Sequence, residues 1–249
     1  LSMLSFLRLT SLIISGILAW VFSIIINDIS DFKIDLISNN KRPFVNKVLN
    51  LSQYKLIGVI SLVFSLIFSS IVGEKFLLGF LIIILLSLIY SIYPLMLKRF
   101  LIISRLPLSL VAAILVLLGF MLTSPENAIS IFPMKLLFGI IIALLFSTNF
   151  IDIKDTEGDR KEGIKTITTK FGLKNGKIII SFLMAFSYIS LPFMLNIYTL
   201  IVPSIIISFI NHNYIVKKKY EEKPIFRVYF FYILILSTYV LLNKNIILS

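Results

Sequence analysis

The chain alternates long apolar runs with short polar segments. Eight apolar runs have about the 20-residue length that crosses a lipid bilayer as a helix. They cover residues 9–26, 54–73, 76–94, 107–123, 133–151, 177–195, 197–216 and 226–243. Apolar residues follow one another within each run instead of alternating with polar ones, and a helix satisfies its own backbone hydrogen bonds in lipid. The pattern therefore predicts an all-α integral membrane protein, a transmembrane helix bundle with eight spans.

The composition agrees with a membrane protein. Of the 249 residues, 58% are hydrophobic and 14% are charged, whereas soluble domains average about 45–50% apolar and about 25% charged residues. The mean hydropathy is +1.01. Because the chain has no cysteine, a disulfide framework and a thiolate metal site are excluded. The net charge is +12, and the basic residues that produce it lie between the apolar runs. This placement suits binding to an anionic membrane face and an anionic substrate better than binding to nucleic acid.

The basic residues are distributed unevenly between the loops. The loops that follow the first, third, fifth and seventh runs, with the helix ends beside them, hold twenty of the 24 Lys and Arg residues. The other side has only Arg8, Lys75, Lys135 and Lys244. Since cytoplasmic loops of membrane proteins carry the excess of positive charge, the odd-numbered loops are predicted to be cytoplasmic and the first residue to lie outside.

All six aspartates fall into two clusters, each with intervals of three and then four residues. The first acidic cluster is Asp28, Asp31 and Asp35 after the first run, and the second acidic cluster is Asp152, Asp155 and Asp159 after the fifth. This spacing leaves the three carboxylates of a cluster on one helical face. One such cluster alone is compatible with helix capping or a solvated surface. Two clusters of oxygen ligands without nearby His or Cys favour Mg²⁺, which also takes phosphate oxygens, so the sequence predicts a diphosphate clamped through metal ions on the cytoplasmic side.

The two clusters also indicate an internal repeat. From Asp28 to Asp152 is 124 residues, which spans four predicted helices. We therefore expect two parallel four-helix pseudo-repeats, about 1–123 and 133–249, within a single transmembrane domain over 1–249. The long loops at about 28–53 and 152–176 match in position and length and could together form a cap.

Three stretches resemble motifs of the UbiA-type intramembrane prenyltransferase superfamily, which includes 4-hydroxybenzoate, homogentisate and digeranylgeranylglyceryl phosphate synthase-like enzymes. The stretches are NDxxDxxxD at 27–35 followed by the RP pair at 42–43, DxxDxEGD at 152–159 followed by Gly163, Thr166 and Gly172, and YSIYPLMLKR at 90–99. The last is similar to the tyrosine-and-lysine stretch of plastid-type aromatic prenyltransferases, with Tyr93 where that form has its first proline. The family fold has nine helices, and its first acidic motif lies at the end of the second helix. Here that motif follows the first apolar run, so the resemblance implies that the family's first helix is missing.

The resemblance implies a mechanism and metal ligands. In such enzymes two Mg²⁺ ions held by the acidic motifs bind the diphosphate of an isoprenyl donor, whose departure leaves an allylic carbocation that the acceptor attacks. The principal ligands would be Asp28, Asp31, Asp152 and Asp155, with support from Asn27, Asp35 and Asp159.

Basic and aromatic residues complete the expected site. Arg42, Lys98 and Lys41 are candidates for the diphosphate oxygens, although a lysine at a cytoplasmic helix end, such as Lys98, can also be a topology anchor. Tyr90 and Tyr93 are candidates to shield a carbocation through their ring faces, with an interfacial tyrosine belt as the alternative.

The acceptor is expected to be lipophilic or aromatic, and the tyrosine-and-lysine stretch favours an aromatic one, such as a quinone precursor. The alternative is an archaeal ether-lipid synthase that adds geranylgeranyl to geranylgeranylglyceryl phosphate. A cation transporter is a remote alternative, because its sites should lie near the bilayer midplane on broken helices, whereas both acidic clusters follow apolar spans at one surface.

Overall fold

The computed structural model describes residues 3–38, 42–101, 103–123 and 128–242, which form helices, turns and loops and no strand. The longer helices are α1 (Met3–Ser30), α3 (Leu51–Val72), α4 (Glu74–Ser91), α5 (Leu106–Thr123), α7 (Met134–Ser147), α10 (Leu173–Met194), α11 (Ile201–Val216) and α12 (Glu222–Leu242). The shorter ones are α2 (Phe32–Ser38), η1 (Leu97–Arg99), α6 (Ala128–Ile131), η2 (Thr148–Ile151), α8 (Asp152–Lys161), α9 (Ile167–Phe171) and η3 (Tyr198–Leu200). The predicted all-α class is confirmed.

Seven helical stretches in the described part are long and apolar enough to cross a membrane, with Met134–Lys161 counted as one stretch. They correspond to the first seven predicted spans. The eighth predicted span, 226–243, overlaps α12, which is helical but is not one of the seven. The eighth span therefore stays a prediction.

The chain divides into two compact units. Unit 1 is Leu1–Lys98 with Leu110–Phe132, and unit 2 is Arg99–Ser109 with Pro133–Ser249. The boundary after Phe132 lies close to the one expected between the two halves, but the short segment Arg99–Ser109 belongs to the second unit, which the sequence pattern did not predict. The internal repeat and the single domain stay predictions.

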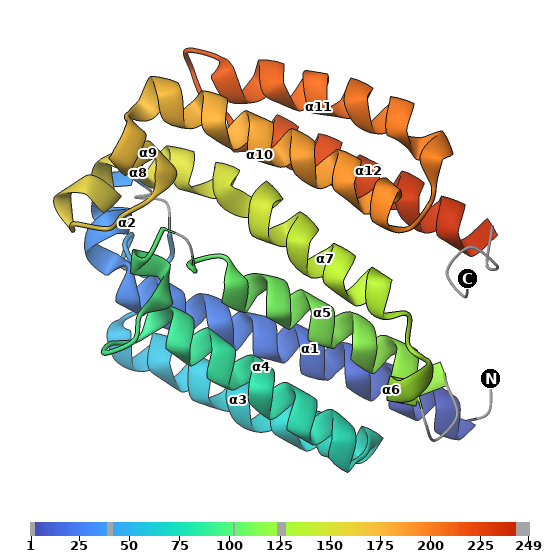
Figure 1. The fold of residues 1–249 in the computed structure, drawn as a ribbon. Coiled ribbons are helices and arrows are strands. Elements are labelled where there is room, and N and C mark those ends of the chain that lie inside the picture. The colour runs from blue at the N-terminus through green and yellow to red at the C-terminus, as the bar shows by residue number, and fades with distance from the viewer. Residues whose placement is uncertain (1–2, 39–41, 102, 124–127, 243–249) are drawn as a thin grey trace. The chain divides into compact units, whose positions relative to one another are not determined.

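Unit 1 is built around α1, which packs against α3 and α4 (Figure 1). Small residues line the contact with α3. The hydroxyl of Ser15 donates to the carbonyl of Ser65 at 2.7 Å, and the hydroxyl of Ser65 donates to the carbonyl of Ser15 at 2.9 Å. Small side chains let two helix backbones approach closely, and the reciprocal bonds satisfy both hydroxyls inside the bundle.

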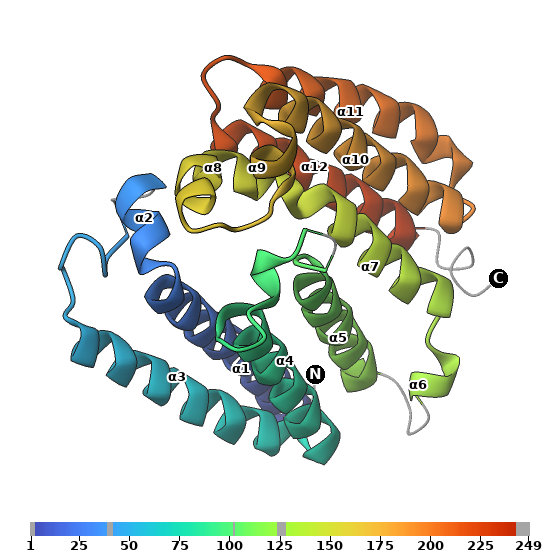
Figure 2. The same ribbon diagram turned by 60° about the vertical axis from the view of Figure 1, so that its left-hand side comes forward.

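Unit 2 is built around α10, which packs against α7 and α11. Tyr188 of α10 lies in the apolar core, where the amide of Asn211 donates to its hydroxyl at 2.6 Å. The hydroxyl of Tyr232 in α12 donates to the Tyr188 carbonyl, also at 2.6 Å. These bonds tie α11 and α12 to α10, while α8 and α9 lie at one end of α7 and α10 (Figure 2).

The outward faces of both units are apolar, as helices that face lipid require. Trp20 in α1 is 65% exposed, and Phe182 in α10 is 67% exposed. Such faces are continuous along the spans and identify an integral membrane protein.

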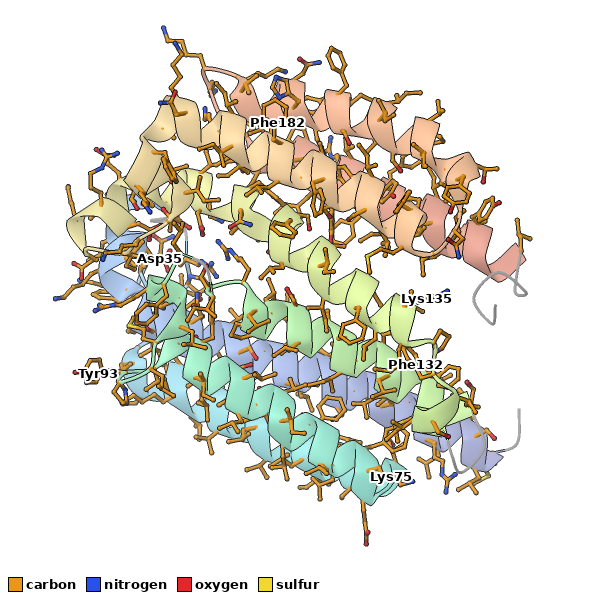
Figure 3. The ribbon with its side chains drawn as sticks, viewed as in Figure 1. Asp35, Lys75, Tyr93, Phe132, Lys135 and Phe182 are labelled. Carbon is orange, nitrogen blue, oxygen red and sulfur yellow. The ribbon has the colours of Figure 1, made fainter. Side chains whose placement is uncertain are left out.

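Each unit carries its acidic cluster at one end. In unit 1, Asp35 and Tyr93 lie at the end opposite Lys75, the lysine beside the turn between α3 and α4 (Figure 3). In unit 2, α8 follows the end of α7 that is opposite Lys135 (Figure 3). Lys75 in unit 1 and Lys135 in unit 2 therefore lie at the end opposite the acidic cluster of the same unit (Figure 3).

Candidate functional site

The first acidic cluster occupies the junction of α1 and α2. Asp28 in the last turn of α1 is 2% exposed, and Asp35 in α2 is 5% exposed. Helical bonding continues through the junction, because the Asp31 amide donates to the Asn27 carbonyl at 2.8 Å and the Asp35 amide to the Asp31 carbonyl at 2.9 Å. The three aspartates thus follow one helical path, as their spacing predicted.

Buried Tyr54 and partly exposed Arg42 both contact the Asp28 carboxylate. The Tyr54 hydroxyl donates to one carboxylate oxygen at 2.7 Å, and the Arg42 guanidinium lies 2.7 Å from the other. Arg42 is also 3.9 Å from Asp35. The ring of Phe44, two residues after Arg42, stacks on Tyr54 with centroids 5.4 Å apart, which holds the arginine segment against α3. A carboxylate removed from water needs such donors, since an unpaired buried charge is very costly.

Lys98 completes the first cluster. It lies in η1, is 7% exposed, and its ammonium is 2.5 Å from the Asp31 carboxylate. The same nitrogen donates to the Ser30 hydroxyl at 3.0 Å and to the Asn27 side-chain oxygen at 3.4 Å. A lysine that only anchored a helix end in the membrane surface would remain solvated, so the burial of Lys98 favours a role in the site.

The remaining candidates of the first unit are Tyr90, Tyr93 and Lys41. Tyr90 is half-buried in the last turn of α4. Tyr93 is 80% exposed and points away from the helices (Figure 3), so the structure does not bring it to the acidic cluster. Lys41 lies outside the described residues.

The second acidic cluster lies along α8. Asp152 and Asp155 are in its first turn, and Asp159, at 6% exposure, is buried further along. Asp152 forms an ion pair with Arg105, whose side chain is 6% exposed. Arg105 immediately precedes α5, and its carbonyl accepts from the amide and the hydroxyl of Ser109. The second cluster, like the first, therefore forms an ion pair with a buried basic residue of its own unit.

The loop after α8 is fixed by threonines and a glycine. Gly163 has φ +70°, the left-handed conformation that glycine adopts without strain. Thr166 and Thr169 form a capping box at the start of α9. The Thr156 hydroxyl of α8 donates to the Thr168 hydroxyl of α9 at 2.7 Å. These contacts position α8 and with it the second cluster.

A hollow of about 680 Å³ opens beside this loop. Its lining residues are the apolar Phe100, Leu101, Ile103 and Ile164, the basic Arg160, Lys165 and Lys170, and Gly163 and Thr169.

Tyr220 adds a neutral donor near the second cluster. Its hydroxyl donates to the Phe150 carbonyl at 2.6 Å. Burial raises the pKa of Tyr220 well above its usual value, and the negative charges of Glu222, Asp152 and Asp155 raise it further. The phenol therefore stays protonated and keeps its hydrogen bond.

Two residues that contact the acidic clusters were not predicted from the sequence. Tyr54 and Arg105 each stand at the start of an apolar run, where an aromatic or basic residue is expected at the membrane interface. Their burial against Asp28 and Asp152 has no counterpart in the sequence pattern. The only available signal was indirect, namely that a buried carboxylate requires a buried partner.

The donor set fits Mg²⁺ that arrives with a phosphate substrate. Among the residues that the structure describes, no three acidic, His or Cys side chains converge closely enough to hold a metal ion by themselves. Mg²⁺ is commonly bound by one or two carboxylates, with waters and substrate phosphates as the other ligands. Each acidic cluster has three aspartates, which is enough to provide one or two carboxylates to a metal ion.

A known protein family matches most of the chain. The UbiA prenyltransferase family matches residues 2–235 of this chain. None of the curated protein sequences compared with it gave a significant match.

Solved structures share the fold. A UbiA homolog from Archaeoglobus fulgidus bound to DMAPP and Mg²⁺ is 18% identical with a TM-score of 0.72, and the match covers 97% of this chain and 88% of the homolog. Its complex with GPP and Mg²⁺ gives 18% identity and a TM-score of 0.71, over 98% and 88% of the two chains. A digeranylgeranylglyceryl phosphate synthase is 22% identical with a TM-score of 0.52, over 98% and 90%.

Proposed function

The chain belongs to the UbiA prenyltransferase family, and on that premise we propose that it uses Mg²⁺ to transfer an isoprenyl group from a polyprenyl diphosphate to an aromatic acceptor of the quinone-precursor type. The observation that carries the proposal is the pairing of both acidic clusters with basic side chains, the partly exposed Arg42 and the buried Lys98 in unit 1 and the buried Arg105 in unit 2. The homologs that bind DMAPP or GPP with Mg²⁺ support the donor and the metal by analogy.

The carboxylates would hold the metal. Asp28, Asp31, Asp152 and Asp155 are the proposed principal ligands, and Asp35 and Asp159 the proposed supporting residues, as the motifs imply. Mg²⁺, when bound, supplies charge neutralisation of the diphosphate leaving group. That both clusters act on one diphosphate is part of the proposal and rests on the sequence motifs.

The basic residues would hold the diphosphate oxygens. Lys98 offers a point charge with three donors, and Arg42 offers a planar fork that can bind two oxygens at once. Asn27 and Ser30, which accept hydrogen bonds from Lys98, orient that ammonium. Tyr90 is proposed to face the isoprenyl cation through its ring.

The alternative acceptor is geranylgeranylglyceryl phosphate, which would make the chain an ether-lipid synthase. The likeness to a digeranylgeranylglyceryl phosphate synthase favours it. Arg160, Lys165 and Lys170, which line the hollow, suit the phosphate of this acceptor.

The experiment uses the full chain in lipid nanodiscs with labelled geranylgeranyl diphosphate, Mg²⁺ and either an aromatic or a glycerol phosphate acceptor. We expect transfer that EDTA abolishes. Asp28→Ala and Asp152→Ala should reduce it by about 100-fold or more, the order of loss when a group that stabilises transition-state charge is removed.

Glu221→Ala is the matched control, because Glu221 is an acidic residue outside both motifs with a side chain 62% exposed. Its activity should equal that of the unmodified chain. The acceptor that is prenylated decides between the two alternatives. The proposal is wrong if no acceptor is prenylated and both aspartate variants bind the donor as the unmodified chain does.

A further inference from the structure

Arg105 is buried without a role that the sequence motifs assign. The residue is 5% exposed, and its guanidinium forms an ion pair with Asp152, whose side chain is 19% exposed. Two hydrogen bonds from Ser109 to its carbonyl fix its backbone at the start of α5. The guanidinium therefore reaches Asp152 from a fixed point in the same unit.

The pair differs from an ordinary surface ion pair. Lys219 and Glu221, for comparison, are 3.9 Å apart with side chains 91% and 62% exposed, and such pairs contribute little to stability. Burial of a guanidinium is unfavourable unless a carboxylate compensates it. Arg105 and Asp152 thus depend on each other whenever no other cation is bound to the carboxylate.

A metal ion would compete with Arg105. Mg²⁺ binds carboxylate oxygen at about 2.0–2.1 Å, and the guanidinium already contacts that group. Two cations so close together repel each other strongly away from bulk water. Arg105 must then move away from the oxygen that the metal takes.

We propose that Arg105 is a positioning residue of the second acidic cluster. It is the counter-ion of Asp152 in the metal-free protein, leaves that carboxylate when Mg²⁺ binds, and is then available to the diphosphate oxygens. The inference rests on the proposed function, because it takes Asp152 as a Mg²⁺ ligand.

The first cluster has a parallel arrangement. Lys98, seven residues before Arg105, meets Asp31 in unit 1 at 2.5 Å. One short segment thus provides a buried basic residue to an aspartate of each cluster, Lys98 within unit 1 and Arg105 within unit 2. The motif resemblance had pointed only to the lysine.

The first test follows Arg105 in the unmodified chain. The purified protein in nanodiscs is treated with an arginine-specific dicarbonyl reagent, with and without Mg²⁺, and modification of each arginine is measured by mass spectrometry. Modification of Arg105 should become severalfold faster with Mg²⁺ but not with NaCl of equal ionic strength. Arg99, which is exposed on the same segment, is the internal control. An unchanged rate at Arg105 under saturating Mg²⁺ overturns the inference.

The second test measures Mg²⁺ binding by calorimetry. Arg105→Met should tighten the binding of Mg²⁺ alone by about tenfold, within the range of coupling between contacting residues, and weaken the binding of pyrophosphate in the presence of Mg²⁺. Arg99→Met should change neither. If Arg105→Met binds Mg²⁺ as the unmodified chain does, or more weakly, the inference is wrong. The dicarbonyl experiment decides if this variant does not fold.

Asp152→Asn distinguishes a failure of the inference about Arg105 from a failure of the proposed metal site. If this substitution weakens Mg²⁺ binding while Arg105→Met has no effect, the inference fails and the proposed function stands. If it leaves Mg²⁺ binding unchanged, Asp152 is not a metal ligand, and the metal assignment fails together with the inference.

Discussion

Asp28 shows, at the scale of single residues, how a membrane helix can end on a buried carboxylate. One of its oxygens accepts a hydrogen bond from Tyr54 and the other lies beside Arg42. The Phe44 ring stacks on Tyr54, so that apolar packing and charge compensation stabilise the same segment. The donors are therefore part of the fold as well as of the candidate site.

Tyr54→Phe tests this compensation. The substitution keeps the ring and its stacking but removes a donor to a buried carboxylate, so the free energy of unfolding should fall by about 1–3 kcal/mol. The measurement is the apparent melting temperature in detergent. Tyr93→Phe, at a tyrosine that is 80% exposed, should not change it. Equal shifts for both variants would contradict the assigned role of Tyr54.

Lys98→Met tests the predicted contact with the diphosphate. Loss of a hydrogen bond to a charged group is equivalent to about 1.5–3 kcal/mol, so kcat/KM for the isoprenyl donor should fall by roughly 10- to 100-fold. Steady-state kinetics with a fixed acceptor measures this value. Arg99→Met, which removes the neighbouring but exposed charge, is the control. A similar fall in kcat/KM in both variants would indicate a general charge effect.

At the scale of helices, the position of the second cluster depends on a close approach between α9 and α10. A Cβ on Gly176 would lie 2.8 Å from the Cα atom of Thr168, and Thr168 accepts the hydrogen bond from Thr156 of α8. The backbone of α9 must therefore shift if Gly176 carries a side chain, and α8 shifts with it.

Gly176→Ala should accordingly lower the free energy of unfolding by about 1–3 kcal/mol, the usual effect of overpacking, and reduce activity with it. Gly119→Ala is the matched control inside α5, where an added Cβ meets nothing within 4 Å and alanine favours the helix. Melting temperatures of the two variants are compared. A loss at Gly119 as large as that at Gly176 would show that helical glycines are needed for another reason.

The helices could be predicted well because lipid requires continuous apolar runs, but their ends could not. The run at 54–73 becomes α3, which begins three residues earlier at Leu51, because Asn50 and Gln53 form a capping box there. Helix α10 likewise begins at Leu173, before the run at 177–195. Polar first turns extend a helix beyond its apolar part, and hydropathy does not detect them.

The grouping of the aspartates along a helix in each unit could also be predicted, since their spacing is local. Their partners could not. Which of many basic residues near a helix end becomes buried depends on tertiary packing, as Arg105 against Asp152 illustrates. Lys98 was found only through the motif resemblance, and Tyr93 of the same motif is exposed.

At the scale of the whole molecule, the orientation in the membrane remains a prediction from charge. In unit 1 the acidic cluster lies at the end opposite Lys75, and in unit 2 α8 lies at the end opposite Lys135 (Figure 3). Each unit can therefore be tested separately for the side on which its acidic end lies. The proposed site would be cytoplasmic only if both acidic ends face that compartment.

Single cysteines can provide that test directly, because the 249 residues of the chain include none. Lys33→Cys and Lys218→Cys mark the basic loops, and Lys75→Cys and Lys135→Cys mark the opposite ends; all four lysines are exposed. The positive-inside rule predicts that a membrane-impermeant maleimide labels the second pair in intact cells and the first pair only after permeabilisation. Labelling of Lys33→Cys or Lys218→Cys in intact cells would place the acidic end of that unit outside and contradict a cytoplasmic active site.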